Sequence, residues 1–469
     1  MIPKLPMHYL FFVVTALFCS ATSLQAEEQS DQATPLTLEQ QYDDDLSVPL
    51  LDPEHAQWFS VPYSFGYPPL ISNDMNLSAY EWNTFDTRWI NMRALAMLAG
   101  DWTRFYQNDL NRMQVGDLNY YNRFDVRGIR LGAGGTINFE HPWTYLFSAA
   151  INAAQKDYDW GSGNWYTVFD ALLGIPLWGE YGRLQVGKMK EPLSMERSMG
   201  LVFEQVMERP MHLDALLPSR DIGVTLSDMI LDGRVTWRAG FFNDWLDEPG
   251  RSISQSNLVT VGRLTGVVYE EGERLLHLGA GYRHEEIREG SVRYDVGPEQ
   301  SFVPSWLDTG EFAADASQTL NLELTWMDGP LWFASEYTAT RVDSELYGNP
   351  LFRGYHLSVN YFVTGEHRGY NHRTGTVRRI TPVLDFSEGG WGAVELSARY
   401  SRLSLNDAAI RGGEMAIVSA GFIWHPRYDL QFHAQWSRAV LESPDPSRLF
   451  ASRESESDIL QFRIVFMVD

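Results

Sequence analysis

Histidine is the side chain most suited to acid–base catalysis and metal binding, and in this sequence the histidines are scattered. Seven of the eleven lie in the second half of the chain, at His277, His284, His356, His367, His372, His425 and His433. No two of them have the H-E-x-x-H spacing of a metal site, and no G-x-S-x-G turn presents a serine nucleophile. Acyl transfer needs a nucleophile and a base within hydrogen-bond reach of each other. The sequence therefore predicts no catalytic site, no metal site and no cofactor, which argues against an enzyme such as a lipase or protease.

The role of the remaining charged side chains depends on the strands that carry them. From Arg88 onward, apolar and polar residues alternate along the sequence. Residues 430–437 (LQFHAQWS) and 394–401 (VELSARYS) are the clearest segments. The same spacing recurs in residues 235–241, 322–326 and 357–361. Successive side chains of a strand point to opposite faces, so each segment has one apolar and one polar face.

A soluble β-sandwich would alternate in the same way, but two features argue against it. Charges of both signs occupy polar positions that so large a soluble core would have to bury. Aromatic residues also collect near the segment ends, where a membrane-interface girdle would lie. These are Trp143, Tyr145, Trp160, Trp165, Tyr166, Trp178, Trp332, Trp391, Trp424 and Tyr428. Since lipid tolerates only helices or closed barrels, and no apolar run is long enough for a membrane helix, the sequence predicts an all-β transmembrane antiparallel barrel.

The number of strands follows from the length of the alternating region. A spanning strand of about 9–11 residues with its connections uses about 23–28 residues. Residues 88–469 then accommodate about 14 to 18 strands, an even number, around an aqueous lumen. The apolar face of the closing strand is Leu460, Phe462, Ile464, Phe466 and Val468. Outer-membrane barrels usually end on an aromatic residue, so with Asp469 at the end we expect Phe466 to take that role.

The N-terminal residues predict a signal peptide spanning residues 1–26. Lys4 precedes an apolar run from Tyr9 to Phe18, and small residues lead to a cleavage position after Ala26. This run is too short to span a bilayer. The single cysteine, Cys19, leaves with the signal peptide, so the exported chain has no disulfide framework.

The charge is distributed unevenly along the chain. Residues 27–87 hold twelve acidic residues and no Lys or Arg, and we expect a largely flexible acidic extension there. Residues 88–469 hold 36 basic and 49 acidic residues, a net charge of −13. This negative balance argues against nucleic acid as a partner, but it says little about the interior of a channel.

Three stretches of the alternating region resemble the phosphate-selective porin O and P family of Gram-negative outer membranes. The first combines residues 187–193 (GKMKEPL), 207–209 (MER) and 217–224 (LPSRDIGV). The second combines residues 361–366 (YFVTGE), 368–370 (RGY) and Pro382, and the third combines residues 392–401 (GAVELSARYS), 405–407 (LND) and 412–413 (GG). The resemblance implies a 16-stranded, trimeric porin with an inward-folded constriction loop. That loop should lie between Gly187 and Arg220, where Pro192, Pro210 and Pro218 interrupt the strand pattern.

The resemblance also implies which side chains hold an anion at the constriction. The matching basic positions are Arg197, Arg209, Arg263 and, from the first strand, Arg93 or, if the alignment slides, Arg112; Arg93 is preferred. Asp170 matches the aspartate of the family's site, whereas the family's adjacent serine pair is replaced by Gly200-Leu201. Lys188 and Lys190 share parity on a strand and are further candidates.

An alternative is that each arginine is paired with an acidic residue to hold a loop, since Glu196, Glu204 and Glu208 lie nearby in the sequence. The basic run of Arg368, Arg373, Arg378 and Arg379 is expected to be a solvated loop or to contact lipid headgroups. Guanidinium groups that do face the lumen can replace the hydration of an oxyanion with charge-assisted hydrogen bonds.

We therefore expect an outer-membrane channel for passive diffusion of small anions, with phosphate or related oxyanions as solutes. The alternative is a general porin, or one for another solute, without phosphate specificity. The expected partners are outer-membrane lipid, lipopolysaccharide, small anions such as phosphate, and two further copies of the chain in a homotrimer.

Overall fold

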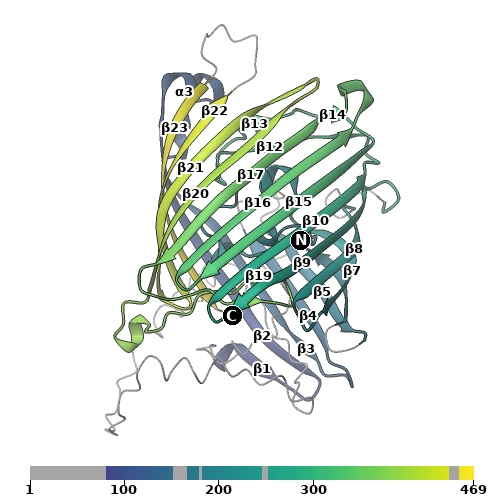
Figure 1. The fold of residues 1–469 in the computed structure, drawn as a ribbon, viewed down its shortest axis with the longest axis vertical. Coiled ribbons are helices and arrows are strands. Elements are labelled where there is room, and N and C mark those ends of the chain that lie inside the picture. Colours follow the sequence, from purple (N-terminus) through teal and green to yellow (C-terminus); the bar gives the residue numbers. More distant parts are fainter. Residues whose placement is uncertain (1–80, 152–165, 179–181, 246–251, 443–453, 469) are drawn as a thin grey trace, which may run out of the picture. The chain divides into compact units, whose positions relative to one another are not determined.

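The computed structural model describes residues 81–151, 166–178, 182–245, 252–442 and 454–468, and the long strands of these residues form one antiparallel wall (Figure 1). The expected signal peptide, and the expected extension up to residue 80, lie outside the described residues. The wall strands in chain order are β2 (Ile90–Gln107), β3 (Phe124–Ile137), β4 (Trp143–Ile151), β5 (Tyr166–Pro176), β6 (Arg183–Met189), β7 (Asp221–Ile230), β8 (Val235–Asn243), β9 (Leu258–Glu271), β10 (Arg274–Glu286), β15 (Ala316–Asp328), β16 (Leu331–Asp343), β17 (Leu351–Phe362), β20 (Ala393–Asp407), β21 (Ile410–Arg427), β22 (Leu430–Glu442) and β23 (Glu454–Val468).

These sixteen strands close into a barrel because β2 pairs with both β3 and β23, the last strand. Trp102 on β2, for example, is the register partner of Phe124 on one side and of Phe462 on the other. The prediction of a transmembrane barrel of about sixteen strands is confirmed. A short strand, β1 (Thr84–Asp86), continues the wall along the edge of β2, where Thr84 pairs with Arg93.

The side-chain pattern of the wall is the reverse of a soluble protein's. On β22, Gln431, His433 and Gln435 are buried inside, whereas Trp436 on the opposite parity is 38% exposed. On β20, Glu395 is fully buried while Leu396 is 49% exposed. Alternation therefore places polar groups in the lumen and apolar groups on the outer surface, as a barrel in lipid requires.

The aromatic residues expected at the membrane interface divide into two groups. Trp178 and Trp391 are exposed at strand ends, in agreement with a girdle. Trp332 is only 1% exposed and lies under the guanidinium of Arg368, 4.5 Å from the ring centroid, so its assignment to the girdle is wrong. Among the described helices, none is long and apolar enough to cross a membrane.

Short elements occupy the connections between the wall strands. At one end of the barrel lie short turns, β1 and the end of β23, and at the other end lies the helix α3 (Asp109–Val115) (Figure 1). Outer-membrane barrels have short periplasmic turns and longer extracellular loops, which orients the chain. The short elements outside the sixteen long strands, β1 apart, are η2 (Glu81–Asn83), α3 (Asp109–Val115), η3 (Leu118–Tyr121), α4 (Met195–Ser198), η5 (Leu201–Phe203), α5 (Met211–Leu216), β11 (Ser291–Val292), β12 (Asp295–Val296), β13 (Leu307–Asp308), β14 (Phe312–Ala313), η6 (Glu345–Tyr347), β18 (Tyr370–Asn371), β19 (Thr376–Val377) and η7 (Phe386–Glu388).

The segment 190–220, between β6 and β7, folds into the lumen and contacts the opposite wall. Its Glu196 N–H donates to the carboxylate of Glu336 on β16 at 2.7 Å, and its Met207 N–H donates to Gln435 on β22 at 2.9 Å. Asn360 on β17 donates to the Gln205 carbonyl at 3.0 Å. The prediction of an inward-folded constriction loop in this segment is confirmed.

Among the described residues, two further segments enter the lumen, and neither is predicted by the sequence pattern. Segment 287–315, from the loop end, is fixed by Glu299, which accepts hydrogen bonds from Arg399 and Ser401 on β20. Segment 363–392, from the turn end, carries the β18–β19 hairpin, whose carbonyls accept from Arg263 on β9. Side chains of these segments pack with the wall in two apolar clusters, so much of the barrel interior is filled.

Candidate functional site in the barrel lumen

A cavity of about 390 Å³ lies between segments 190–220 and 287–315 and the β3 wall. Six cationic and four acidic side chains line it, together with three serines and parts of residues 295–305. The cationic residues are Arg127, Arg130, Lys190, Arg197, Arg209 and Arg220, and the acidic residues are Glu208, Asp214, Asp295 and Glu299. The formal charge of the lining is therefore positive by two, although the whole chain is acidic.

A β-bulge brings Arg127 and Arg130 to the same face of β3. The register with β2 shifts between Ala99 and Gly100, which pair with Gly128 and Val126, so Arg127 is the extra residue. A bulge of this kind reverses the parity of the strand. Arg127 and Arg130, three positions apart, therefore both line the cavity.

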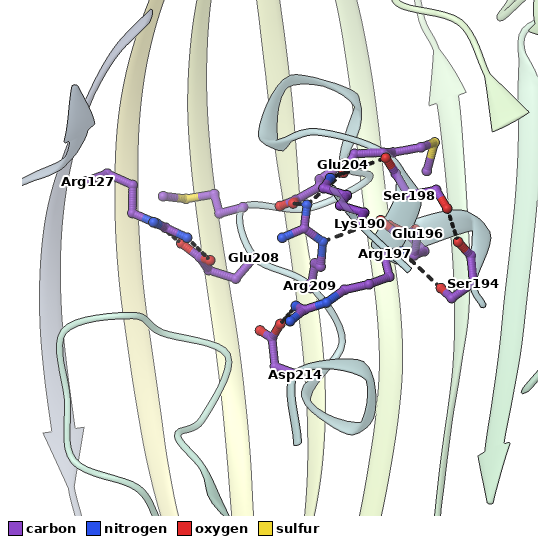
Figure 2. A network of polar contacts seen from close by, with 12 residues as sticks. Arg127, Lys190, Ser194, Glu196, Arg197, Ser198, Glu204, Glu208, Arg209 and Asp214 are labelled. Atoms are coloured by element: carbon purple, nitrogen blue, oxygen red, sulfur yellow. Dashed lines mark hydrogen bonds and ion pairs between the residues drawn. The ribbon is translucent and has the colours of Figure 1, made fainter. Parts of the chain in front are cut away.

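Arg127 and Arg130 differ in their partners. Arg127 forms a bidentate ion pair with Glu208, with N···O distances of 2.7 and 2.9 Å (Figure 2). Arg130 is 6% exposed and stacks on Phe169 at 4.5 Å from the ring centroid. Within the described residues, Arg130 makes no ion pair with a carboxylate. Its charge is thus available to a solute in the cavity.

Arg220 lies directly before β7 and connects the cavity to β5. Its Nε donates to Asp170 at 2.8 Å, and Asp170 also accepts from Ser148 at 2.7 Å. The guanidinium of Arg220 lies 4.8 Å from the ring centroid of Phe169. Arg130 and Arg220 therefore both contact the ring of Phe169, which helps to position two cations close together at the cavity.

Arg209 and Lys190 are held by segment 190–220 itself. Arg209 pairs with Glu204 at 2.9 Å and donates to the Met199 carbonyl at 2.8 Å (Figure 2). The Lys190 ammonium donates to the same carbonyl at 2.7 Å. Burial, together with the guanidiniums of Arg220 and Arg209, holds the pKa of Lys190 well below its usual range. An anion entering here would favour the protonated form of Lys190.

Arg197 has partners on α5 and on the segment that follows it. Its Nη1 pairs with Asp214 at 2.5 Å (Figure 2), and its Nε donates to the Pro218 carbonyl at 2.7 Å. The Ser194 hydroxyl caps α4 by accepting from the Arg197 N–H at 2.9 Å. These contacts fix the guanidinium at the cavity edge while neutralising part of its charge.

The facing side of the cavity, residues 295–305, carries hydroxyls and carboxylates rather than cations. Ser305 donates to Asp295, and Gln300 donates to Thr103 on β2 at 3.0 Å. Ser301 lines the cavity from this side, and Ser219 lines it from segment 190–220. The cavity therefore has hydroxyls although the serine pair of the family pattern is replaced by Gly200-Leu201.

The structure brings together three of the seven predicted site residues. Arg197, Arg209 and Lys190 line one cavity, and Asp170 lies behind it, bonded to Arg220. The alternative of structural pairing also holds in part, because Arg209 pairs with Glu204. Their role as anion ligands stays a prediction.

Arg263, predicted for the same site, lies elsewhere and has a different environment. It donates to both carboxylate oxygens of Glu323, at 2.8 and 2.7 Å, and to the carbonyls of Thr374 and Gly375 at 2.8 and 2.7 Å. Glu323 also contacts His277 at 3.2 Å. These contacts hold the β18–β19 hairpin against the wall, and Arg263 does not line the cavity.

Arg93 and Lys188 also lie outside the cavity lining. Arg93 is 8% exposed on β2, near the turn end, with Thr84 as its register partner. Lys188 is the register partner of Ala171 and Ile222. Asp170 faces the lumen, so its neighbour Ala171 faces outward. Lys188, the register partner of Ala171, therefore lies on the outer face and does not point into the pore as expected. Arg112, the alternative to Arg93, lies exposed on α3.

The basic run of segment 363–392 differs from its predicted solvated state. The side chain of Arg368 is 1% exposed and pairs with Glu395 at 2.8 Å. The expectation of a solvated or lipid-contacting residue is therefore wrong for Arg368. No group of three or more acidic, histidine or cysteine side chains within the described ranges is arranged to hold a metal ion.

Comparison with known proteins identifies related chains. The family model of the phosphate-selective porins O and P matches residues 103–442. An uncharacterised protein of Caulobacter vibrioides is 27% identical over 273 residues, which is 56% of this chain and 55% of that protein. The chain thus spans about half the length of the curated relative that it matches.

Comparison with solved structures gives matches at low sequence identity. OprB of Pseudomonas putida superposes with a TM-score of 0.50 at 9% identity, covering 87% of this chain and 100% of that one. An anion-selective porin from Comamonas acidovorans gives a TM-score of 0.49 at 12% identity, covering 81% and 99%.

Proposed function

Since the chain belongs to the phosphate-selective porin O and P family, we propose that its lumen is an anion-selective path for small oxyanions, phosphate among them. Family and fold indicate a channel of the outer membrane of a Gram-negative bacterium rather than an enzyme. The proposal concerns what passes through that channel.

The observation that carries the proposal is the cationic lining of the cavity between the inward segments. Its six cations exceed its four carboxylates, and Arg130 forms no ion pair with any carboxylate of the described residues. The net charge of the whole chain does not oppose this, because local charge in a narrow passage dominates the field that an ion experiences.

The chemistry is the exchange of water for guanidinium groups. An oxyanion entering the cavity loses part of its hydration, and Arg130, Arg220 and Arg209 can replace it with charge-assisted hydrogen bonds. The carboxylates beside these cations weaken the site, so that an anion can leave again. This balance is what conduction requires.

The direct test is the reversal potential of the purified protein in a planar bilayer with a KCl gradient, followed by phosphate titration. We expect anion selectivity, and block of the chloride current by low phosphate concentrations. Cation selectivity would overturn the proposal. Anion selectivity with a chloride current unchanged by phosphate would instead favour a general anion porin.

We also propose that the barrel assembles as a trimer through the outer face of β2–β5. Ala94, Ala133 and Ala171 lie there in one register row with Phe147, and the three short alanine side chains let another wall approach closely on either side of the phenyl ring. Ala133→Trp should dissociate the assembly, whereas Leu322→Trp, at a position 45% exposed on the outer face of β15, should not. Light scattering of the detergent complex measures the mass, and a monomeric wild type would contradict the proposal.

The rest of the outer surface is proposed to contact lipid and lipopolysaccharide. Apolar residues such as Leu322, Val359 and Leu396 are 41–49% exposed on that face. Lipid tails can cover such side chains at no cost in free energy, whereas water cannot.

A further inference from the structure

The cavity is large for a single inorganic oxyanion. Its 390 Å³ corresponds to roughly a dozen water molecules at about 30 Å³ each. An oxyanion with five heavy atoms would fill only a small part of this volume. Cavities from about 300 Å³ upward typically accommodate small organic ligands.

The two sides of the cavity offer different chemistry. Arg130, Lys190, Arg209 and Arg220 form the cationic side, where burial and the neighbouring guanidiniums of Arg220 and Arg209 lower the pKa of Lys190. Residues 295–305 form the other side, with Asp295, Ser301 and Ser305 among the lining groups. A solute that matched both sides would carry its negative charge at one end and hydroxyls at the other.

Two lining hydroxyls are available to such a solute. Neither Ser219 nor Ser301 makes a side-chain hydrogen bond with another of the described residues, and both are partly exposed to the cavity. The carboxylate of Asp295 accepts from Ser305 and has a further oxygen that can accept from a solute hydroxyl.

The charge of the lining also restricts the solute. Six cations against four carboxylates leave a formal excess of two positive charges. A phosphate monoester carries a charge of about −1.5 to −2 at pH 7, which is close to the value that neutralises this excess. A single carboxylate would neutralise only half of the excess charge.

We propose that the cavity binds phosphate monoesters of small polyols, with the phosphate on Arg130, Arg209 and Arg220 and the polyol hydroxyls on Ser301, Ser219 and Asp295. The inference rests on the proposed anion selectivity and names a solute class for it. Inorganic phosphate passes through the same cationic side but leaves the hydroxyl side to water.

The test compares the block of chloride conductance by glycerol 3-phosphate with the block by n-propyl phosphate, which has the same length and charge but lacks the two hydroxyls. For the wild-type protein, we expect half-block by glycerol 3-phosphate at a concentration about 3- to 10-fold lower, the effect of one or two neutral hydrogen bonds. Ser301→Ala should reduce this ratio towards one without changing the block by propyl phosphate. Ser219→Ala is the second variant.

The control is Ser254→Ala, at an exposed serine outside the cavity lining, which should keep the wild-type ratio. Equal block by both esters in the wild type would overturn the inference, as would a ratio that neither Ser301→Ala nor Ser219→Ala changes. In both cases the anion selectivity measured in KCl would still stand. Cation selectivity in KCl would instead overturn the proposed function itself.

Discussion

Arg263 and Arg130 are both buried in the lumen, but the two regions of the barrel that hold them use the guanidinium differently. Arg263 donates to two carboxylate oxygens of Glu323 and to two hairpin carbonyls. Arg463 and Arg399 are similar, because they pair with Asp101 and Glu299 and also donate to carbonyls of segment 190–220. In these cases the guanidinium fastens an inward segment to the wall.

Arg130 belongs to the second kind. It stacks on Phe169, faces the cavity, and lacks a carboxylate partner among the residues that the structure describes. From this contrast we infer that a buried arginine in this barrel fastens a loop when carboxylates and carbonyls occupy its donors, and that it can bind a solute when they do not. The partner, rather than the residue type or its place in a motif, decides between the two.

The largest effect is expected from removing an arginine that fastens a segment. Arg263→Ala removes the guanidinium that donates to the buried carboxylate of Glu323 and to the carbonyls of Thr374 and Gly375. Breaking a buried ion pair in this way costs about 3–5 kcal/mol. We expect a clearly lower unfolding temperature of the barrel in detergent, and a higher single-channel conductance because the β18–β19 hairpin is released.

Arg411→Ala is the matched control, because Arg411 is exposed and donates only to the carbonyls of Ala408 and Ile410 among described residues. If Arg263→Ala instead left stability intact and abolished phosphate block, Arg263 would be a solute ligand and the division into two kinds would fail.

Arg130→Gln should have the opposite profile. Losing a charge-assisted hydrogen bond weakens anion binding by about 1.5–3 kcal/mol, roughly 10- to 100-fold in half-block concentration. The reversal potential in a KCl gradient should move towards zero, while the unfolding temperature changes less than in Arg263→Ala. Arg411→Gln serves as the control in both measurements, and unchanged selectivity in Arg130→Gln would show that this side chain does not face the ion path.

The barrel was predictable because its information is local and repeated. Alternation in residues 430–437 and 394–401 determines which side chains face the lumen, and the structure buries Gln431 and Glu395 there as expected. The prolines of segment 190–220 likewise interrupt the strand pattern where the loop begins to fold inward. Each of these features lies within a few residues of the structure that it determines.

The site was only partly predictable, because its composition depends on contacts between distant segments. Period-two alternation from Arg130 would place Arg127 on the outer face. No residue pattern in the sequence indicates the bulge that turns the Arg127 side chain into the lumen. Arg263 matched a family position, but its partners, Glu323 and the hairpin carbonyls, are 60 and 111–112 residues away. Arg220 lies within the motif of residues 217–224, and Pro218 in the same motif indicates that Arg220 belongs to the inward loop.

The smallest effect is expected from pH, through the pair of Glu204 and Arg209. Burial raises the pKa of Glu204 to about 7, although Arg209 opposes this, and Arg127 and Arg463 keep neighbouring Glu208 ionised. As pH falls from 8 to 6, Glu204 takes up a proton and ceases to neutralise Arg209, so anion selectivity should rise modestly. The raised pKa also means that this carboxyl's contribution to stability is complete below its ordinary value of 4.5 and is lost as pH rises through about 7. Burial lowers the pKa of His212 on α5 to about 3, so that histidine stays neutral over this range. Glu204→Gln should remove the pH dependence of the reversal potential between pH 6 and 8, and a variant that keeps it would assign the effect to another group.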